Sequence, residues 1–203
     1  MGFVRRGLVS GSVVVLAAML SGGASAAVTA QPVTKAALKP YVLRVGDEPG
    51  YRPDGGSSFS GSTNFVGIPA AIRKRYRAEG YRGNLFEGFY NGAPVGGDEQ
   101  SISSVVVLGS PAAAKSEIKA AFSSAPRPFT IKQIPTSLGV MGSQGKQKAA
   151  EIAWIEGSCF VYIRNFNTGK ASVVDSAYDP RATAIAGALA IYNRTARSGG
   201  VCG

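Results

Sequence analysis

The sequence contains no histidine, and only two of its 203 residues are cysteines. The absence of histidine excludes Ser-His-Asp and Cys-His catalysis and every metal site that needs an imidazole ligand. Two cysteines are also too few for a structural zinc site built from thiolates. We therefore expect no metal and no cofactor, and few kinds of catalysis remain open to the chain.

Motifs for covalent or phosphate chemistry are incomplete. Residues 116–119 and 143–146 both read S-x-x-K, but the Ser-Asp-Asn and Lys-Thr-Gly partners of that motif are missing. The glycine-containing run 139–146 lacks the spacing of a phosphate loop and precedes a predicted strand, where a phosphate loop would precede a helix. Acylation through a Ser-Lys pair and nucleotide hydrolysis are both disfavoured.

Paired carboxylates are the one catalytic apparatus left. Glu87 and Glu151 each lie in the middle of a predicted strand near aromatic residues, where loss of water would raise the pKa of a carboxyl group. The simpler interpretation is an ion pair of Glu151 with Arg164, nearly opposite on the neighbouring strand. A carboxylate-dependent hydrolase is therefore an alternative function, and the leading expectation is a protein without enzymatic activity.

The first 26 residues have the three parts of an export signal. Arg5 and Arg6 precede an apolar run at residues 8–20, and small residues at 24–26 form a cleavage site. The apolar run is shorter than the ~20 residues of a membrane-spanning helix. Cleavage after Ala30 and export by the twin-arginine route both remain open. The pattern predicts a secreted protein without a transmembrane segment after cleavage.

Beyond the signal at 1–26 and a leader at 27–34, residues 35–203 have the length of one domain. The signal holds two of the 22 basic residues and none of the 12 acidic ones, which leaves a formal charge of +8. Outside the cytoplasm such a protein attracts anionic envelope polymers or lipids. No recognised nucleic-acid-binding motif accompanies the charge, so nucleic acid is not an expected partner.

Cys159 and Cys202 make an even count in an oxidising compartment, which predicts a disulfide. The bond would join a predicted strand to the glycine-rich C-terminal tail. A free, buried Cys159 is the alternative, but a lone cysteine in a glycine-rich tail has little use unless it is bonded.

The stretch from Lys148 to Phe166 predicts a β-hairpin with Glu156-Gly157 at its turn. This register places Trp154 opposite Cys159, and Ile152 opposite Val161. Because side chains alternate along a strand, one face is wholly apolar and belongs to the core. That apolar face comprises Ala150, Ile152, Trp154, Cys159, Val161 and Ile163, and the other face carries Glu151, Ala153, Phe160, Tyr162 and Arg164.

The rest of the chain predicts strands at 84–90, 101–108 and 129–134, and a weak strand at 171–174. Helices are expected at 69–79, 110–124 and 181–195, each with proline at its first turn. The segments 53–61 and 136–145 read as a loop and a connector. Strands and helices do not alternate regularly, so the fold class is α+β, with an antiparallel sheet of about five strands and helices on one face.

Two groups of residues are candidate binding sites. The mixed face of the hairpin and the strand expected at 84–90 offer Tyr90, Glu151, Tyr162 and Arg164 as ligand contacts. A basic patch, with tyrosines interleaved, consists of Arg73, Lys74, Arg75, Arg77 and Arg82. Such a patch can hold anionic groups, although a solvated helix face explains it equally well.

The order of features resembles a loosely defined set of exported actinobacterial proteins that includes lipoproteins and the sensor ectodomains of kinases. The resemblance rests on Gly46-Asp47-Glu48-Pro49-Gly50-Tyr51, on the strand and small-residue helix of Ser103–Ala121, and on Ile155–Tyr162 followed by a C-terminal helix. It implies an antiparallel sheet with helices, used for ligand sensing or envelope binding. This chain has no lipid-anchor cysteine near the cleavage site, which puts a membrane-tethered role in doubt.

Three functions follow from the sequence. The first is a secreted, non-catalytic binding or sensor-like protein of the bacterial envelope, with a small ligand or an anionic polymer or lipid as partner. The second is the hydrolase that depends on Glu87 or Glu151. The third is a structural protein that associates with anionic wall or membrane through the basic patch.

Overall fold

The structure is a computed structural model, and it describes residues 33–65, 68–91, 99–123, 128–144, 147–167, 178–196 and 200–203. The expected export signal, most of the leader and the weak strand expected at 171–174 lie outside these residues. In the part of the chain that is described, no helix combines the length and apolarity needed to cross a bilayer.

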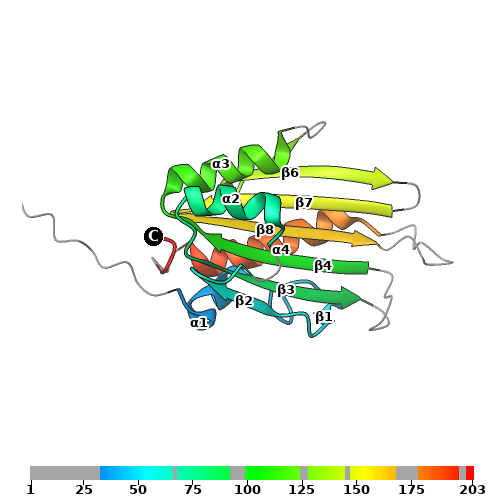
Figure 1. Cartoon of the computed structure of the whole chain (residues 1–203). Helices are drawn as coiled ribbons and strands as arrows, with labels where there is room; N and C mark the ends of the chain where they lie inside the picture. Colours follow the sequence, from blue (N-terminus) through cyan, green and yellow to red (C-terminus); the bar gives the residue numbers. More distant parts are fainter. Residues whose placement is uncertain are drawn as a thin grey trace, which may run out of the picture. The chain divides into compact units, whose positions relative to one another are not determined.

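One antiparallel sheet forms the centre of the domain (Figure 1). Its strands are β1 (Arg52–Pro53), β2 (Ser58–Gly61), β3 (Gly83–Asn91), β4 (Glu99–Val107), β5 (Phe129–Ile131), β6 (Ile134–Gln144), β7 (Gln147–Glu156) and β8 (Cys159–Asn167). The helices are α1 (Lys35–Leu38), the 3-10 turn η1 (Lys39–Tyr41), α2 (Ala70–Ala78), α3 (Pro111–Phe122) and α4 (Pro180–Thr195). The strand order is β1-β3-β4-β8-β7-β6-β5, and β2 also pairs with β3.

The α+β class and the antiparallel sheet are confirmed, but the sheet has eight strands within the described residues, and not about five. Two strands lie where the composition suggested irregular structure: β2 in the Gly/Ser-rich segment, and β6 in the expected connector. In β6, Gly139 lies under the ring of Phe129, and a Cβ at this glycine would be only 2.4 Å from that ring. Gly139 contributed to the prediction of a connector. In the structure a glycine is needed at this position, because the ring of Phe129 packs directly against the backbone of β6.

Helices cover both faces of the sheet, where the sequence predicted one. On the α4 face, α1, η1 and α4 pack on a core that includes Leu85, Val105, Ile152, Trp154 and Val161. On the opposite, α2–α3 face, the two helices pack on Val106, Ala153 and Phe160. Part of the hairpin's mixed face, including Ala153 and Phe160, therefore belongs to a second hydrophobic core. The sequence did not predict this second apolar layer, because polar residues such as Glu151 are interspersed among its apolar residues.

The hairpin formed by β7 and β8 has the predicted faces but a different turn. The two-residue loop is Gly157-Ser158, with φ of +53° at Gly157, and Trp154 lies opposite Val161. The predicted register was wrong by two residues. Because side chains repeat every two residues, this error leaves each side chain on its predicted face. All six side chains predicted to form the apolar face are fully buried.

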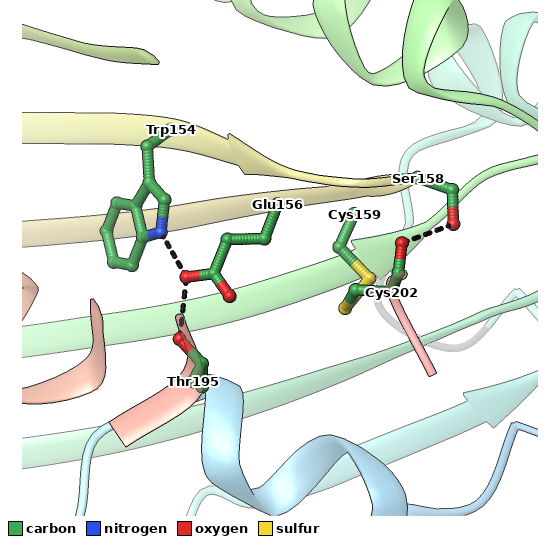
Figure 2. Close-up of a disulfide and its surroundings, with 6 residues drawn as sticks. All are labelled: Trp154, Glu156, Ser158, Cys159, Thr195 and Cys202. Carbon is green, nitrogen blue, oxygen red and sulfur yellow. Dashed lines mark hydrogen bonds between the residues drawn. A yellow bond between two sulfur atoms is a disulfide. The ribbon is translucent and has the colours of Figure 1, made fainter. Parts of the chain in front are cut away.

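The disulfide between Cys159 and Cys202 is confirmed, with 5.1 Å between the two Cα atoms (Figure 2). The C-terminal segment lies across the hairpin turn, where the Cys202 carbonyl accepts a 2.7 Å hydrogen bond from the Ser158 N–H. Beside it, the Glu156 carboxylate accepts hydrogen bonds from Trp154 Nε1 (2.8 Å) and Thr195 Oγ1 (2.6 Å). These contacts attach α4 and the C-terminal segment to the closed end of the hairpin.

Candidate functional site

A groove runs along the α2–α3 face, over the central strands of the sheet. Its largest hollow has a volume of about 400 Å³ and lies between α2 and α3, where Phe160 and Tyr162 form part of the floor. A second hollow of about 340 Å³ shares Tyr76, Ser104 and other lining residues with it, and a third of about 240 Å³ shares Glu151. The sizes are in the range of small-molecule sites. We call these three hollows the groove.

The floor of the groove comes from alternate residues of neighbouring strands. Ser104 of β4 lies directly opposite Tyr162 of β8, and Tyr162 lies opposite Ala153 of β7. One step along the strands, Arg164 lies opposite Glu151. Antiparallel pairing thus places the three predicted contacts Glu151, Tyr162 and Arg164 side by side on one face.

Glu151, Tyr162 and Arg164 form a small polar constellation at the edge of the largest hollow. Nε of Arg164 is 3.5 Å from Oε1 of Glu151, so the ion pair expected from the sequence is present. Burial, together with the nearby Glu151 carboxylate, raises the pKa of the Tyr162 hydroxyl, which stays protonated. The guanidinium of Arg164 also lies over the ring of Phe166, 4.8 Å from its centroid.

The two helical walls of the groove are joined by an ion pair. Arg75 of α2 donates two hydrogen bonds to Glu117 of α3, Nε to Oε1 at 2.5 Å and Nη2 to Oε2 at 2.8 Å. The hydrogen bonds to Glu117 raise the pKa of Arg75, which holds its charge. Burial, with the Glu117 carboxylate nearby, raises the pKa of the Tyr76 hydroxyl. The largest hollow is lined by all three side chains.

Tyr90, the fourth predicted contact, belongs to the same face but not to the groove. It lies on β3 opposite Gln100 and beside Arg52 of β1, and it is not among the residues that line the three hollows. Its identity as an aromatic residue in a strand gave no information on how far along the face it would lie.

The basic patch lies mainly on α2, and most of its members have partners within the chain. Arg73 Nε donates to the Ile68 carbonyl at 2.7 Å, and the guanidinium of Arg77 lies 4.9 Å from the centroid of the Phe65 ring. Arg75 is paired with Glu117, as described above. Lys74 is exposed, and Arg82 precedes β3. The patch is therefore also a means of fixing α2.

The two candidate catalytic carboxylates are not brought together. Glu87 lies on the α4 face, where it accepts hydrogen bonds from Lys39 Nζ (2.8 Å) and Ser57 Oγ (3.0 Å). Glu151 lies on the α2–α3 face, and β4 and β8 separate the two parent strands. Within the described ranges, no three Cys, Asp or Glu side chains cluster as a metal ion would require.

The residues that sequence reasoning missed are Tyr76, Ser104 and Glu117 of the groove. Glu117 is the only acidic residue of α3, and it is buried to 3% exposure. Its burial depends on Arg75, 42 residues earlier in the chain. No local pattern connects the two residues.

The segment Gly46–Tyr51, which carried the family resemblance, makes contacts on the α4 side of the sheet. Arg194 of α4 binds the Asp47 carboxylate at 3.0 Å, and the Glu48 carboxylate accepts from Ser101 Oγ at 3.0 Å. Tyr51 donates to Glu99 at 3.0 Å. The segment thus connects α4 to β4, and its role in the fold is structural.

Neither a protein-family model nor a curated protein sequence matches this chain. Among solved structures, the fold is similar to that of the extracellular domain of PknH from Mycobacterium tuberculosis, seen in its crystal structure, with a TM-score of 0.51 and 10% sequence identity. The match covers 81% of this chain and 99% of that domain. The likeness concerns the fold, and it agrees with the resemblance to exported sensor ectodomains; the disulfide also fits an extracytoplasmic protein.

Proposed function

We propose that this protein is a secreted, non-catalytic binding protein of the bacterial envelope that holds a small ligand in the groove of the α2–α3 face. The observation that carries the proposal is the hollow of about 400 Å³ on the Phe160 and Tyr162 face. It combines apolar walls with a few converging polar groups, the usual composition of a ligand site. The likeness to an extracellular domain and the export-signal pattern support the location.

The groove supports binding better than hydrolysis. Its two carboxylates each have a cation or a donor beside them: Glu117 bonds to Arg75, and Glu151 lies beside Arg164 and Tyr162. The hydrolase considered from the sequence needs two carboxyl groups on opposite sides of one scissile bond. Glu87 and Glu151, on opposite faces of the sheet, do not offer that arrangement.

A thermal-shift screen with envelope lipids, glycans and peptides tests the proposal. Ala121 is exposed on α3 and lines the largest hollow, so Ala121→Trp should fill its mouth without disturbing the core. Ala112→Trp, on the same helix but outside the hollows, is the matched control. Thermal stability is the suitable readout, because Trp154 is buried on the α4 face and does not report directly on the groove.

We expect at least one ligand class to raise the melting temperature of the wild type and of Ala112→Trp, and not of Ala121→Trp. Shifts that are equal in all three proteins would place the binding elsewhere. No shift with any ligand class would contradict the proposal.

A further inference from the structure

The end of the groove near Arg164 has the properties of a subsite for an anion. The third hollow, of about 240 Å³, is lined by Arg164, Glu151, Ser143, Gln147 and two small residues. The side chain of Arg164 is 43% exposed, and its guanidinium is therefore accessible from this hollow. A guanidinium presents several N–H donors in one plane and pairs well with carboxylate or phosphate oxygens.

The guanidinium of Arg164 is not fully occupied by hydrogen bonds within the protein. Its contact with Glu151 is 3.5 Å, longer than a good charge-assisted hydrogen bond. Its Nε atom has no hydrogen-bond partner but is buried, so a ligand would reach the exposed part of the guanidinium. The Glu151 carboxylate, in turn, is shared with the Tyr162 hydroxyl. Arg194 of α4, by comparison, is 3.0 Å from its carboxylate partner Asp47 and also binds two backbone carbonyls. A ligand oxygen could therefore bind Arg164 without breaking a tight internal pair.

Space for such a group comes from Gly142 and Ala149, which lie opposite each other on β6 and β7. A Cβ built at Gly142 would meet no atom within 4 Å, so the backbone there borders open space. The amide side chain of Gln147, on the same face of β7 as Ala149, borders the same hollow. A carboxylate or phosphate could enter without moving the backbone.

Away from Arg164 the groove becomes apolar. The largest hollow continues past Phe160, Ala120 and Ile72, and the hollow beyond it is lined mainly by apolar side chains, among them Ile68, Phe86 and Val106. Burial of an alkyl chain there gains about 0.8 kcal/mol per methylene group. Without the export signal the protein carries a formal charge of +8, which attracts anions and repels cations.

We propose that the ligand is an anionic amphiphile, whose carboxylate or phosphate binds Arg164 while its apolar chain lies along the groove toward Phe160 and Phe86. This proposal rests on the binding function proposed above and specifies its ligand. It also assigns Arg164 as the residue that selects the charged end of the ligand.

Calorimetric titration with three probes below their critical micelle concentrations tests the assignment. Dodecanoate and dodecyl phosphate carry the two candidate anionic groups, and dodecyl maltoside carries an uncharged one. We expect at least one anionic probe to bind about tenfold more tightly than the maltoside, and the stronger of the two identifies the anion. Inorganic phosphate alone should bind much more weakly, because it lacks the chain.

Two variants address the subsite itself. Arg164→Gln should remove the preference for the anionic head, and Gly142→Leu should fill the subsite while leaving Arg164 in place. Arg164→Gln should leave binding of dodecyl maltoside within about twofold, because the uncharged head does not need the guanidinium. Arg44→Gln, an exposed arginine outside the groove, is the charge-matched control and should change nothing.

Equal affinity for charged and uncharged probes, or an unchanged preference in both variants, would overturn the proposal, and so would the absence of binding by every probe. The two proposals fail separately. Binding of glycans or uncharged peptides that depends on Ala121, without any preference for anionic amphiphiles, would leave the binding function standing and reject the amphiphile.

Discussion

Arg75 and Glu117 connect α2 to α3 across the groove through two hydrogen bonds of 2.5 and 2.8 Å. Glu117 is buried, whereas the side chain of Arg75 is 40% exposed. The pair therefore joins a fixed carboxylate in one wall to a partly solvated cation in the other. Both side chains line the largest hollow of the groove.

Replacement of Arg75 alone should destabilise the protein more than replacement of both Arg75 and Glu117. Arg75→Leu leaves the Glu117 carboxylate buried without its cation. We expect this to lower the free energy of unfolding by about 2 kcal/mol. The loss should be smaller than for a fully buried ion pair, because water can reach Glu117 from the side of the groove. The double variant Arg75→Leu/Glu117→Leu should recover most of that loss. Urea denaturation of the four proteins in this double-mutant cycle measures the coupling.

Lys115→Leu, an exposed change on α3, is the control for the added apolar surface of the leucine. A loss of stability in the double variant equal to the sum of the losses in Arg75→Leu and Glu117→Leu would show that the two side chains are not coupled.

Glu48 should make the stability of the protein depend on pH. Burial, only partly offset by the hydrogen bond from Ser101, raises the pKa of its carboxyl from 4.5 to about 8, with the negative charge of Asp47 adding to the effect. Between these two values the unfolded chain releases the proton and the folded protein keeps it, so stability falls as the pH rises. The fall should reach up to about 5 kcal/mol between pH 4.5 and pH 8.

Denaturation at a series of pH values, with wild type and Glu48→Gln in parallel, measures this effect. The glutamine variant should lose most of the slope, while Asp54→Asn, at an exposed carboxylate, should retain it. Tyr178 lies near Glu48 but titrates far above this range, because burial raises its pKa. A slope of the same size in Glu48→Gln would assign it to another group.

The bond between Cys159 and Cys202 should contribute about 4 kcal/mol to stability, because it closes a loop of 43 residues in the unfolded chain. Reduction, or the change of both cysteines to serine, should lower the midpoint of urea unfolding accordingly. Alkylation of unfolded samples with and without a reductant verifies the state of the bond. Unchanged stability after complete reduction would contradict the estimate.

Local signals predicted part of the fold correctly. Ser110 and Asp179 precede proline at the starts of α3 and α4, and each side chain accepts a hydrogen bond from the first turn, as such caps do. The alternation around Trp154 predicted the buried face of the hairpin. These features depend on residues within a few positions of each other, which is why the sequence alone sufficed.

The missed features depend on residues far apart in the chain. Strand β2 forms because Phe59 and its neighbours pair with β3, although the segment itself is rich in glycine and serine. Of the four predicted contacts, Glu151, Tyr162 and Arg164 meet because β7 and β8 are adjacent, and Tyr90 lies two strands from Arg164. The groove itself needs both α2 and α3 above the sheet, and no local pattern specifies their spacing.

The covalent bond at the closed end of the hairpin also sets an order of events. Cys159 belongs to a central strand, but its partner Cys202 follows 43 residues later, beyond α4. Neither the pairing of the sheet nor the packing of α4 requires the C-terminal segment, so both can precede the bond, which forms in an oxidising compartment. In maturation, the disulfide would thus lock a fold that already exists rather than guide the sheet toward it.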